Sequence, residues 1–189
     1  MRARARPRGN DLTVYRILAL AVALVLVPAT AFAAQQKAII YPFDLIDQQQ
    51  QFEIGIMPQG LDPEDKRRLG LITEELTKLI KESGRYEVVD PAPIAAEIEE
   101  KAPMHKCNGC EDDLAKKVGA DIAFIGTVRK ASDVLFTVSV YVRDVAQQKV
   151  IDQASSEIYG NTDAMWLRAV RYLVHKRLYK DKDKVGAGQ

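Results

Sequence analysis

Two neighbouring segments with different hydrophobic patterns constrain the fold of this chain most strongly. Residues 122–128 (IAFIGTV) are a nearly continuous apolar run, which is the pattern of a β-strand covered on both faces. In residues 134–143 (VLFTVSVYVR) the side chains alternate with period two, which predicts a strand with one buried and one mixed face. We therefore expect a central strand at 122–128 and a sheet with helices packed on it.

A long amphipathic helix is predicted between residues 62 and 84. Asp62 is a typical N-cap residue, and Pro63 suits the first turn of a helix. The apolar residues that follow recur at helical spacing: Leu69, Ile72, Leu76, Leu79 and Ile80. Gly84 is expected to stop the helix, and burial of the apolar stripe is expected to stabilise it.

The remaining elements are shorter. Residues 37–43 (KAIIYPF) predict a first strand that leaves the sheet at Pro42, because proline cannot donate a ladder hydrogen bond. Residues 44–61 contain glutamines, glycines and a proline without periodicity, so they predict a long exposed loop and a candidate recognition segment. The other predicted elements are a strand at 86–89, helices at 91–101 and 110–118, a strand at 149–159, and a last helix that begins at Thr162 and places Trp166 in the core.

These elements follow the order β-α-β-α-α-β-β-β-α. They predict an α/β (α+β) fold with a mixed sheet of about five strands, an antiparallel C-terminal meander and helices packed on the sheet. A chain of 189 residues suits one domain, which we place at residues 37–179, with a polar tail at 180–189.

The N-terminal segment has the three parts of a secretory signal peptide. Four arginines within residues 1–10 precede the uncharged stretch 17–27, and the triplet Ala31-Phe32-Ala33 follows. The stretch is short of the roughly 20 apolar residues that a membrane-spanning helix needs, so we expect cleavage after Ala33 or Ala34 and no permanent membrane anchor. No cysteine adjoins the cleavage site, so no lipid attachment is expected. The sequence predicts an exported, periplasmic protein.

Removal of residues 1–33 changes the charge balance. That segment holds five arginines and one aspartate, so the remaining chain carries 22 basic and 25 acidic residues, a net charge of −3. A mildly acidic domain without a basic stripe lacks the electrostatic footprint of nucleic-acid binding. Nucleic acid is therefore excluded as a partner.

The order of four segments resembles a known family. KAIIYPF, LITEELTKLIKESGRYEVVD, DDLAKKVGADIAFIGTVRK and LFTVSVYVRDVAQQKVI together resemble the small α/β domain at the N-terminus of TolB and in CsgG-type envelope proteins. The ending GNTDAMWLRAVRYLVHKRL is similar to that of exported proteobacterial proteins classed only as a domain of unknown function. The resemblance covers about residues 37–178. It implies a fold and a role in the cell envelope, and it implies no chemistry, because fold does not determine function.

The two cysteines, Cys107 and Cys110, form a C-x-x-C motif with three open interpretations. The favoured one is a structural disulfide across the turn at Asn108 and Gly109, which stabilises the fold by about 2 kcal/mol in the chain-entropy model. A redox-active thiolate at Cys107 is the second, although the acids at 111–113 oppose a thiolate. In the third, Met104, His105, Cys107 and Cys110 bind Cu(I) or Zn(II).

The other polar groups give weaker signals. Glu111, Asp112 and Asp113 suit the first turn of a helix better than a cation site. Asp44 and Asp47 could form a carboxylate pair, but no histidine, serine or lysine lies nearby in the sequence. Gly126, inside a strand, more often marks a close approach of backbone than a ligand site.

No nucleophile elbow, phosphate-binding loop or dinucleotide fingerprint is present, so we expect no catalytic residues and no cofactor. The sequence favours a non-enzymatic periplasmic interaction module that binds another envelope protein through the 44–61 loop and a sheet edge. The alternative is a thiol-redox or soft-metal (Cu/Zn) protein built on Met104 to Cys110.

Overall fold

The computed structural model describes residues 35–47 and 61–178. The expected signal peptide, most of the expected loop at 44–61 and the expected polar tail lie outside these residues. Within them, no helix combines the length and hydrophobicity that crossing a membrane requires.

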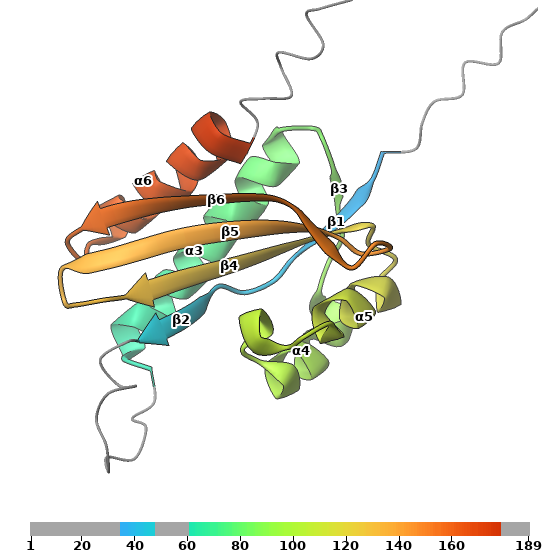
Figure 1. Cartoon of the computed structure of the whole chain (residues 1–189), viewed down its shortest axis with the longest axis horizontal. Helices are drawn as coiled ribbons and strands as arrows, with labels where there is room; N and C mark the ends of the chain where they lie inside the picture. Colours follow the sequence, from blue (N-terminus) through green and yellow to red (C-terminus); the bar gives the residue numbers. More distant parts are fainter. Residues whose placement is uncertain (1–34, 48–60, 179–189) are drawn as a thin grey trace, which may run out of the picture. The chain divides into compact units, whose positions relative to one another are not determined.

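The described residues form a mixed six-stranded sheet with helices on both faces (Figure 1). The strands are β1 (Lys37–Ile40), β2 (Asp44–Asp47), β3 (Glu87–Val88), β4 (Ile122–Lys130), β5 (Leu135–Asp144) and β6 (Lys149–Tyr159). Their order is β3-β1-β4-β5-β6, and β2 also pairs with β4. The pairs of β1 with β3 and of β1 and β2 with β4 are parallel, while β4, β5 and β6 form an antiparallel meander. The predicted mixed α/β fold and its C-terminal meander are confirmed.

The helical elements are α3 (Pro63–Glu82), α4 (Ala95–Lys101), α5 (Cys110–Lys117) and α6 (Asp163–Tyr172). Short 3-10 turns, η1 (Ala92–Ile94) and η2 (Met104–Lys106), precede α4 and α5, and a π-helical segment, η3 (Leu173–Leu178), continues α6. The predicted caps are present: Asp62 accepts hydrogen bonds from the backbone amides of Glu64 and Asp65, and Thr162 accepts one from that of Met165.

Two apolar clusters, one on each face of the sheet, hold the fold together. Helices α3 and α6 cover one face, where Trp166 is fully buried as predicted. Helices α4 and α5 cover the other face near β1 (Figure 1). Strand β4 lies between the two clusters, and its first seven residues are all buried. The prediction of a central strand covered on both faces is therefore confirmed.

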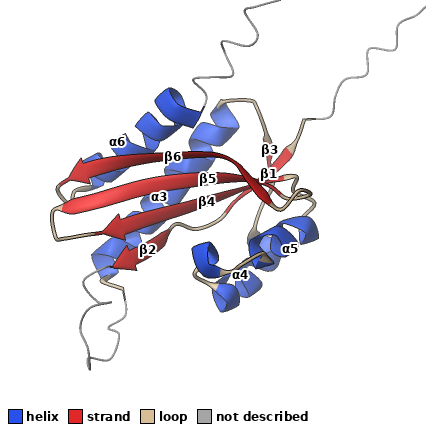
Figure 2. Cartoon of the chain, viewed as in Figure 1, coloured by secondary structure: helices blue, strands red, loops and turns tan. Residues whose placement is uncertain are grey.

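The sequence prediction is wrong in one segment. Asp44–Asp47 was expected to begin a long loop after the first strand, but it forms β2, a sixth strand of the sheet (Figure 2). Pro42 does end β1, yet the chain returns beside the same neighbour: Ile40 pairs with Phe124, and Asp44 pairs with Thr127. The long strand β4 thus supplies a hydrogen-bonding partner to two short strands in succession.

Candidate functional site

The bend between β1 and β2 forms the floor of a groove. Pro42 has no backbone N–H, and the amide of Phe43 donates a hydrogen bond to Thr73 Oγ1 of α3 at 3.1 Å instead of to a strand. The Phe43 ring lies directly over Gly126, where an added Cβ would stand 2.4 Å from ring carbons. The absence of a side chain at Gly126 therefore permits a close approach, although the group that approaches is a side-chain ring and not the backbone expected from the sequence.

The groove has a volume of about 1210 Å³ and runs between α3 and the segment from β3 to η2. One wall is α3, through Leu69, Gly70 and Thr73, and the opposite wall includes Ile98 of α4 and Met104 of η2. Other apolar side chains line it from the sheet and from the ends of the described segments: Ile40, Phe43, Leu45, Leu61, Val88 and Val89. The lining is therefore contributed by elements that are far apart in the sequence.

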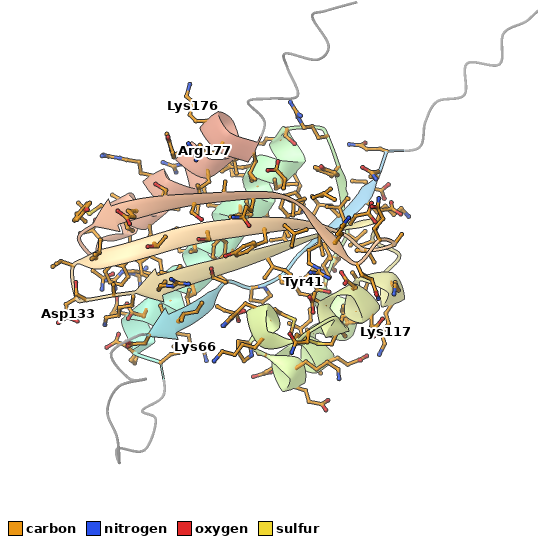
Figure 3. The ribbon with its side chains drawn as sticks, in the orientation of Figure 1. Tyr41, Lys66, Lys117, Asp133, Lys176 and Arg177 are labelled. Carbon is orange, nitrogen blue, oxygen red and sulfur yellow. A yellow bond between two sulfur atoms is a disulfide. The ribbon has the colours of Figure 1, made fainter. Side chains whose placement is uncertain are left out.

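Exposed charges of both signs stand among the lining residues of the groove. Lys66 and Lys81 come from α3, as does Glu74, while Asp90 and Glu99 come from the opposite wall. Figure 3 shows Lys66 at the end of α3 that lies beside β2. Charges at a rim of this kind favour one orientation of a bound partner more than they add affinity.

An aspartate and a histidine meet beside the groove. His105 Nδ1 lies 2.9 Å from Asp44 Oδ2, and the backbone amide of His105 donates to the same oxygen at 2.9 Å. Both side chains are largely buried. His105 Nε2 is also buried, with no hydrogen-bond partner among the described residues. The contact fastens η2 to β2.

Asp44 therefore pairs with His105 and not with Asp47, the carboxylate partner considered from the sequence. Asp44 and Asp47 are three residues apart on a strand, so their side chains leave opposite faces of the sheet. The histidine that meets Asp44 lies 61 residues away in the sequence. No local pattern in the sequence marks this pair.

The structure joins Cys107 and Cys110 in a disulfide with Cα atoms 5.4 Å apart. Both cysteines are half-buried and pack against the second apolar cluster. Asn108 and Gly109, between them, have positive φ angles of 53° and 110°, a conformation that asparagine and glycine tolerate best.

Two of the four ligands considered from the sequence, Met104 and His105, are already engaged by other parts of the fold. Met104 is buried in the apolar cluster, and His105 is engaged by Asp44. The ligand atoms that do lie within 4.8 Å of one another belong to Cys107, Cys110 and Glu111. In the disulfide form neither sulfur is a thiolate, so this group is not a metal site in that state.

Two of the three acids at the start of α5, Glu111 and Asp112, belong to a buried ion-pair network, while Asp113 is exposed. Asp112 is fully buried and accepts two hydrogen bonds from Arg143 of β5, one of them at 3.0 Å. The Glu111 carboxylate accepts a hydrogen bond from the backbone amide of Gly109 at 2.8 Å, and its other oxygen lies 3.5 Å from Arg143 Nε. The hydrogen bonds to Asp112 raise the pKa of the Arg143 guanidinium. The acids lie in the first turn of α5, as predicted, and they also pair with Arg143, which the sequence did not single out.

Tyr41, the residue that follows β1, also contacts this network. Its hydroxyl donates to the backbone carbonyl of Glu111 at 2.6 Å, and Figure 3 shows the residue between the sheet and α5. Burial raises the pKa of Tyr41 above its ordinary value of 10.0, and the nearby charges of Glu111 and Asp112 raise it further. The network anchors α5, and with it the disulfide, to the sheet.

Comparison with known proteins gives a family match. The family model DUF3280, described as "Protein of unknown function (DUF2380)", matches residues 36–178. The match includes the ending GNTDAMWLRAVRYLVHKRL, which carried the resemblance to proteins of unknown function, and extends over nearly the whole range of the resemblance at 37–178. No curated protein sequence matches the chain.

Several solved structures are similar at low identity. The LpoB C-terminal domain from Salmonella enterica has 10% identity and a TM-score of 0.46, with 69% of this chain and 87% of that chain covered. Lipoprotein GNA1162 from Neisseria meningitidis has 13% identity and a TM-score of 0.45, with coverages of 80% and 97%. TolB from Acinetobacter baumannii has 13% identity and a TM-score of 0.38, with coverages of 75% and 28%. Similarities of this degree assign neither a function nor a partner to this chain, and the CsgG-type part of the resemblance gains no support from them.

Proposed function

This chain belongs to the DUF3280 family, and we propose from the geometry of its groove that it is a non-enzymatic binding module of the bacterial cell envelope. Its groove binds an apolar segment of another envelope protein. The observation that carries this proposal is the apolar lining between α3 and α4, framed by exposed charges of both signs.

The size of the groove favours a peptide segment over a small metabolite. At about 1210 Å³ it exceeds the roughly 300–1,000 Å³ that is usual for small-molecule pockets. Several consecutive side chains of an extended or helical segment fit such a volume. Burial of each large apolar side chain would contribute about 1.5–3 kcal/mol, and micromolar binding needs about 8 kcal/mol beyond the entropy cost of association, so several side chains of the segment must be buried together.

The disulfide supports the placement in the envelope. Disulfides persist in oxidising compartments such as the periplasm and are rare in the cytosol. The N-terminal segment, with its arginines and short apolar stretch, supports export independently.

Polar contacts hold the scaffold in place. The buried charges of Asp112 and Arg143 hold α5 to β5, and Asp44 holds η2 through His105. Such contacts position elements of the scaffold, and each of these carboxylates is already engaged by its partner.

Gly70 provides a sharp test, because it lines the groove and no atom lies within 4 Å of an added Cβ. A photo-cross-linking amino acid at position 70 in exporting cells would identify the partner, whose affinity for the purified chain is then titrated. We expect Gly70→Ala to bind normally and Gly70→Trp to bind at least tenfold more weakly, since the indole would project into the groove and occupy part of the partner's place. Both variants gain helix propensity relative to glycine, by about 1 kcal/mol for alanine.

Lys78→Trp is the matched control, because Lys78 is exposed on the same helix and does not line this groove. It should bind as the unmodified chain does. Equal affinities of Gly70→Ala and Gly70→Trp, with both folded by circular dichroism, would show that the groove is not the binding site.

A further inference from the structure

The edge of the sheet opposite β3 is the long strand β6, which pairs with β5. β6 extends over 11 residues, from Lys149 to Tyr159, and pairs along its length with β5. Among the described residues no strand pairs with its other side, and Figure 2 shows β6 as the outermost strand of the meander. An edge strand offers unpaired backbone groups, which makes it a template for a further strand.

Exposed apolar side chains gather at both ends of this strand. Val150 and Ile151, at its start, are 42% and 45% exposed, and Tyr159, at its end, is 69% exposed. Val134 is 62% exposed and adjoins that end, because its carbonyl accepts a hydrogen bond from Gly160. These four are the majority of the six large apolar side chains that are exposed in the described parts of the chain. Clusters of this kind mark interaction surfaces.

The devices that usually protect an edge are confined to one end of β6. A register shift opposite Val142 and Arg143 marks a bulge near Ile151, and the strand's lysine is its first residue. The stretch from Gln153 to Tyr159 is regular, contains no proline and carries one charge, on Glu157. This half of the strand is open to pairing.

We propose that two copies of this chain associate through antiparallel pairing of their β6 strands, with the twofold axis near Ser155. This arrangement places the Tyr159 end of one copy beside the Val150–Ile151 end of the other, so the exposed apolar groups bury each other. It sets Gln153 opposite Glu157 of the other copy, where an amide and a carboxylate form a hydrogen bond.

The middle of the strand suits close approach of the two edges. Ala154, Ser155 and Ser156 are small and uncharged, and no like charges stand directly opposite each other in this register. The surface is therefore complementary to itself, as a closed twofold interface requires. A second copy satisfies every one of these features, and the two meanders form one continuous sheet.

The test is the oligomeric state of the purified exported chain, measured by analytical ultracentrifugation over a range of concentrations. We expect a dimer, and we expect Ile151→Lys or Tyr159→Lys to raise its dissociation constant at least tenfold. Leu61→Lys is the control, because Leu61 is 47% exposed and lies outside β6. It should leave the dimer intact.

A cysteine at the axis tests the register. Antiparallel partners have Cα atoms about 4.5–5.5 Å apart, which a disulfide can bridge, so Ser155→Cys should cross-link two copies under mild oxidation. At protein concentrations below the dissociation constant of the dimer, where every form is monomeric, both lysine variants should keep the urea midpoint of the unmodified chain, since the residues that they replace are exposed. A monomer at all concentrations, or a dimer that both lysine variants leave unchanged, would overturn the proposal.

Discussion

Replacement of Gly126 by alanine tests the contact that shapes the floor of the groove. The added methyl group would stand 2.4 to 2.5 Å from three carbons of the Phe43 ring, well inside van der Waals contact. Phe43 is buried, and its backbone amide is held by Thr73, so the ring has little room to withdraw. Overpacking of this kind costs about 1–3 kcal/mol.

A second term has the opposite sign. Alanine in place of glycine within a strand lowers the entropy of the unfolded chain and gains about 0.5–1 kcal/mol. Because three ring carbons stand at 2.4 to 2.5 Å, the overpacking cost falls in the upper part of its range, at about 2–3 kcal/mol. We therefore expect Gly126→Ala to lower the free energy of unfolding by about 1–2.5 kcal/mol, measured by urea denaturation of the oxidised chain.

A double-mutant cycle separates the contact from other effects. Phe43→Leu shortens the side chain that the methyl group meets, so the cost of Gly126→Ala should fall by at least half in that background. A cost that is the same in both backgrounds, or a Gly126→Ala variant as stable as the unmodified chain, would refute the argument. Because Phe43 also lines the groove, Gly126→Ala should alter partner affinity as well.

Three further predictions concern the anchoring of α5. Asp112→Asn should lower the free energy of unfolding by about 1.5–3 kcal/mol in urea denaturation, because Arg143 loses its charged hydrogen-bond partner and keeps only Glu111, 3.5 Å away; a loss below 1 kcal/mol would contradict this. Joint replacement of Cys107 and Cys110 by serine should cost about 2 kcal/mol and leave groove binding unchanged, whereas lost binding in a stable protein would point to thiol chemistry. Because the folded state raises the pKa of Tyr41 above 10.0, the unfolded chain loses that proton first, so stability should fall as the pH rises beyond about 10, and Tyr41→Phe should flatten this decline in pH-dependent thermal melts.

Elements whose residues carry their own periodicity were predictable from the sequence. The apolar run of β4 and the alternation of β5 follow from the burial of their own side chains. The cap at Asp62 and the proline that follows it mark the start of α3 through local hydrogen bonds. In each case the physical cause lies within a few residues of the pattern.

Elements that depend on distant partners were not predictable. β2 is four residues long and alternates no apolar side chains, so its strand character comes from pairing with β4. The contact of Asp44 with His105 and that of Asp112 with Arg143 join residues 61 and 31 positions apart. The groove is likewise invisible in the sequence, because its lining comes from separate elements that the topology brings together.

The dependence of β1 and β2 on β4 has a consequence for the order of folding. Lys37 donates its backbone hydrogen to a side chain 84 residues later in the chain, and both short strands find their partner in the same distant segment. A chain that emerges N-terminus first, from a ribosome or through a membrane, therefore exposes these strands before β4 exists beside them. The β4–β6 meander, with its local contacts, can form by itself at little loop-closure cost, and it then provides the edge onto which the earlier residues dock. The first residues to appear are thus among the last to find their places.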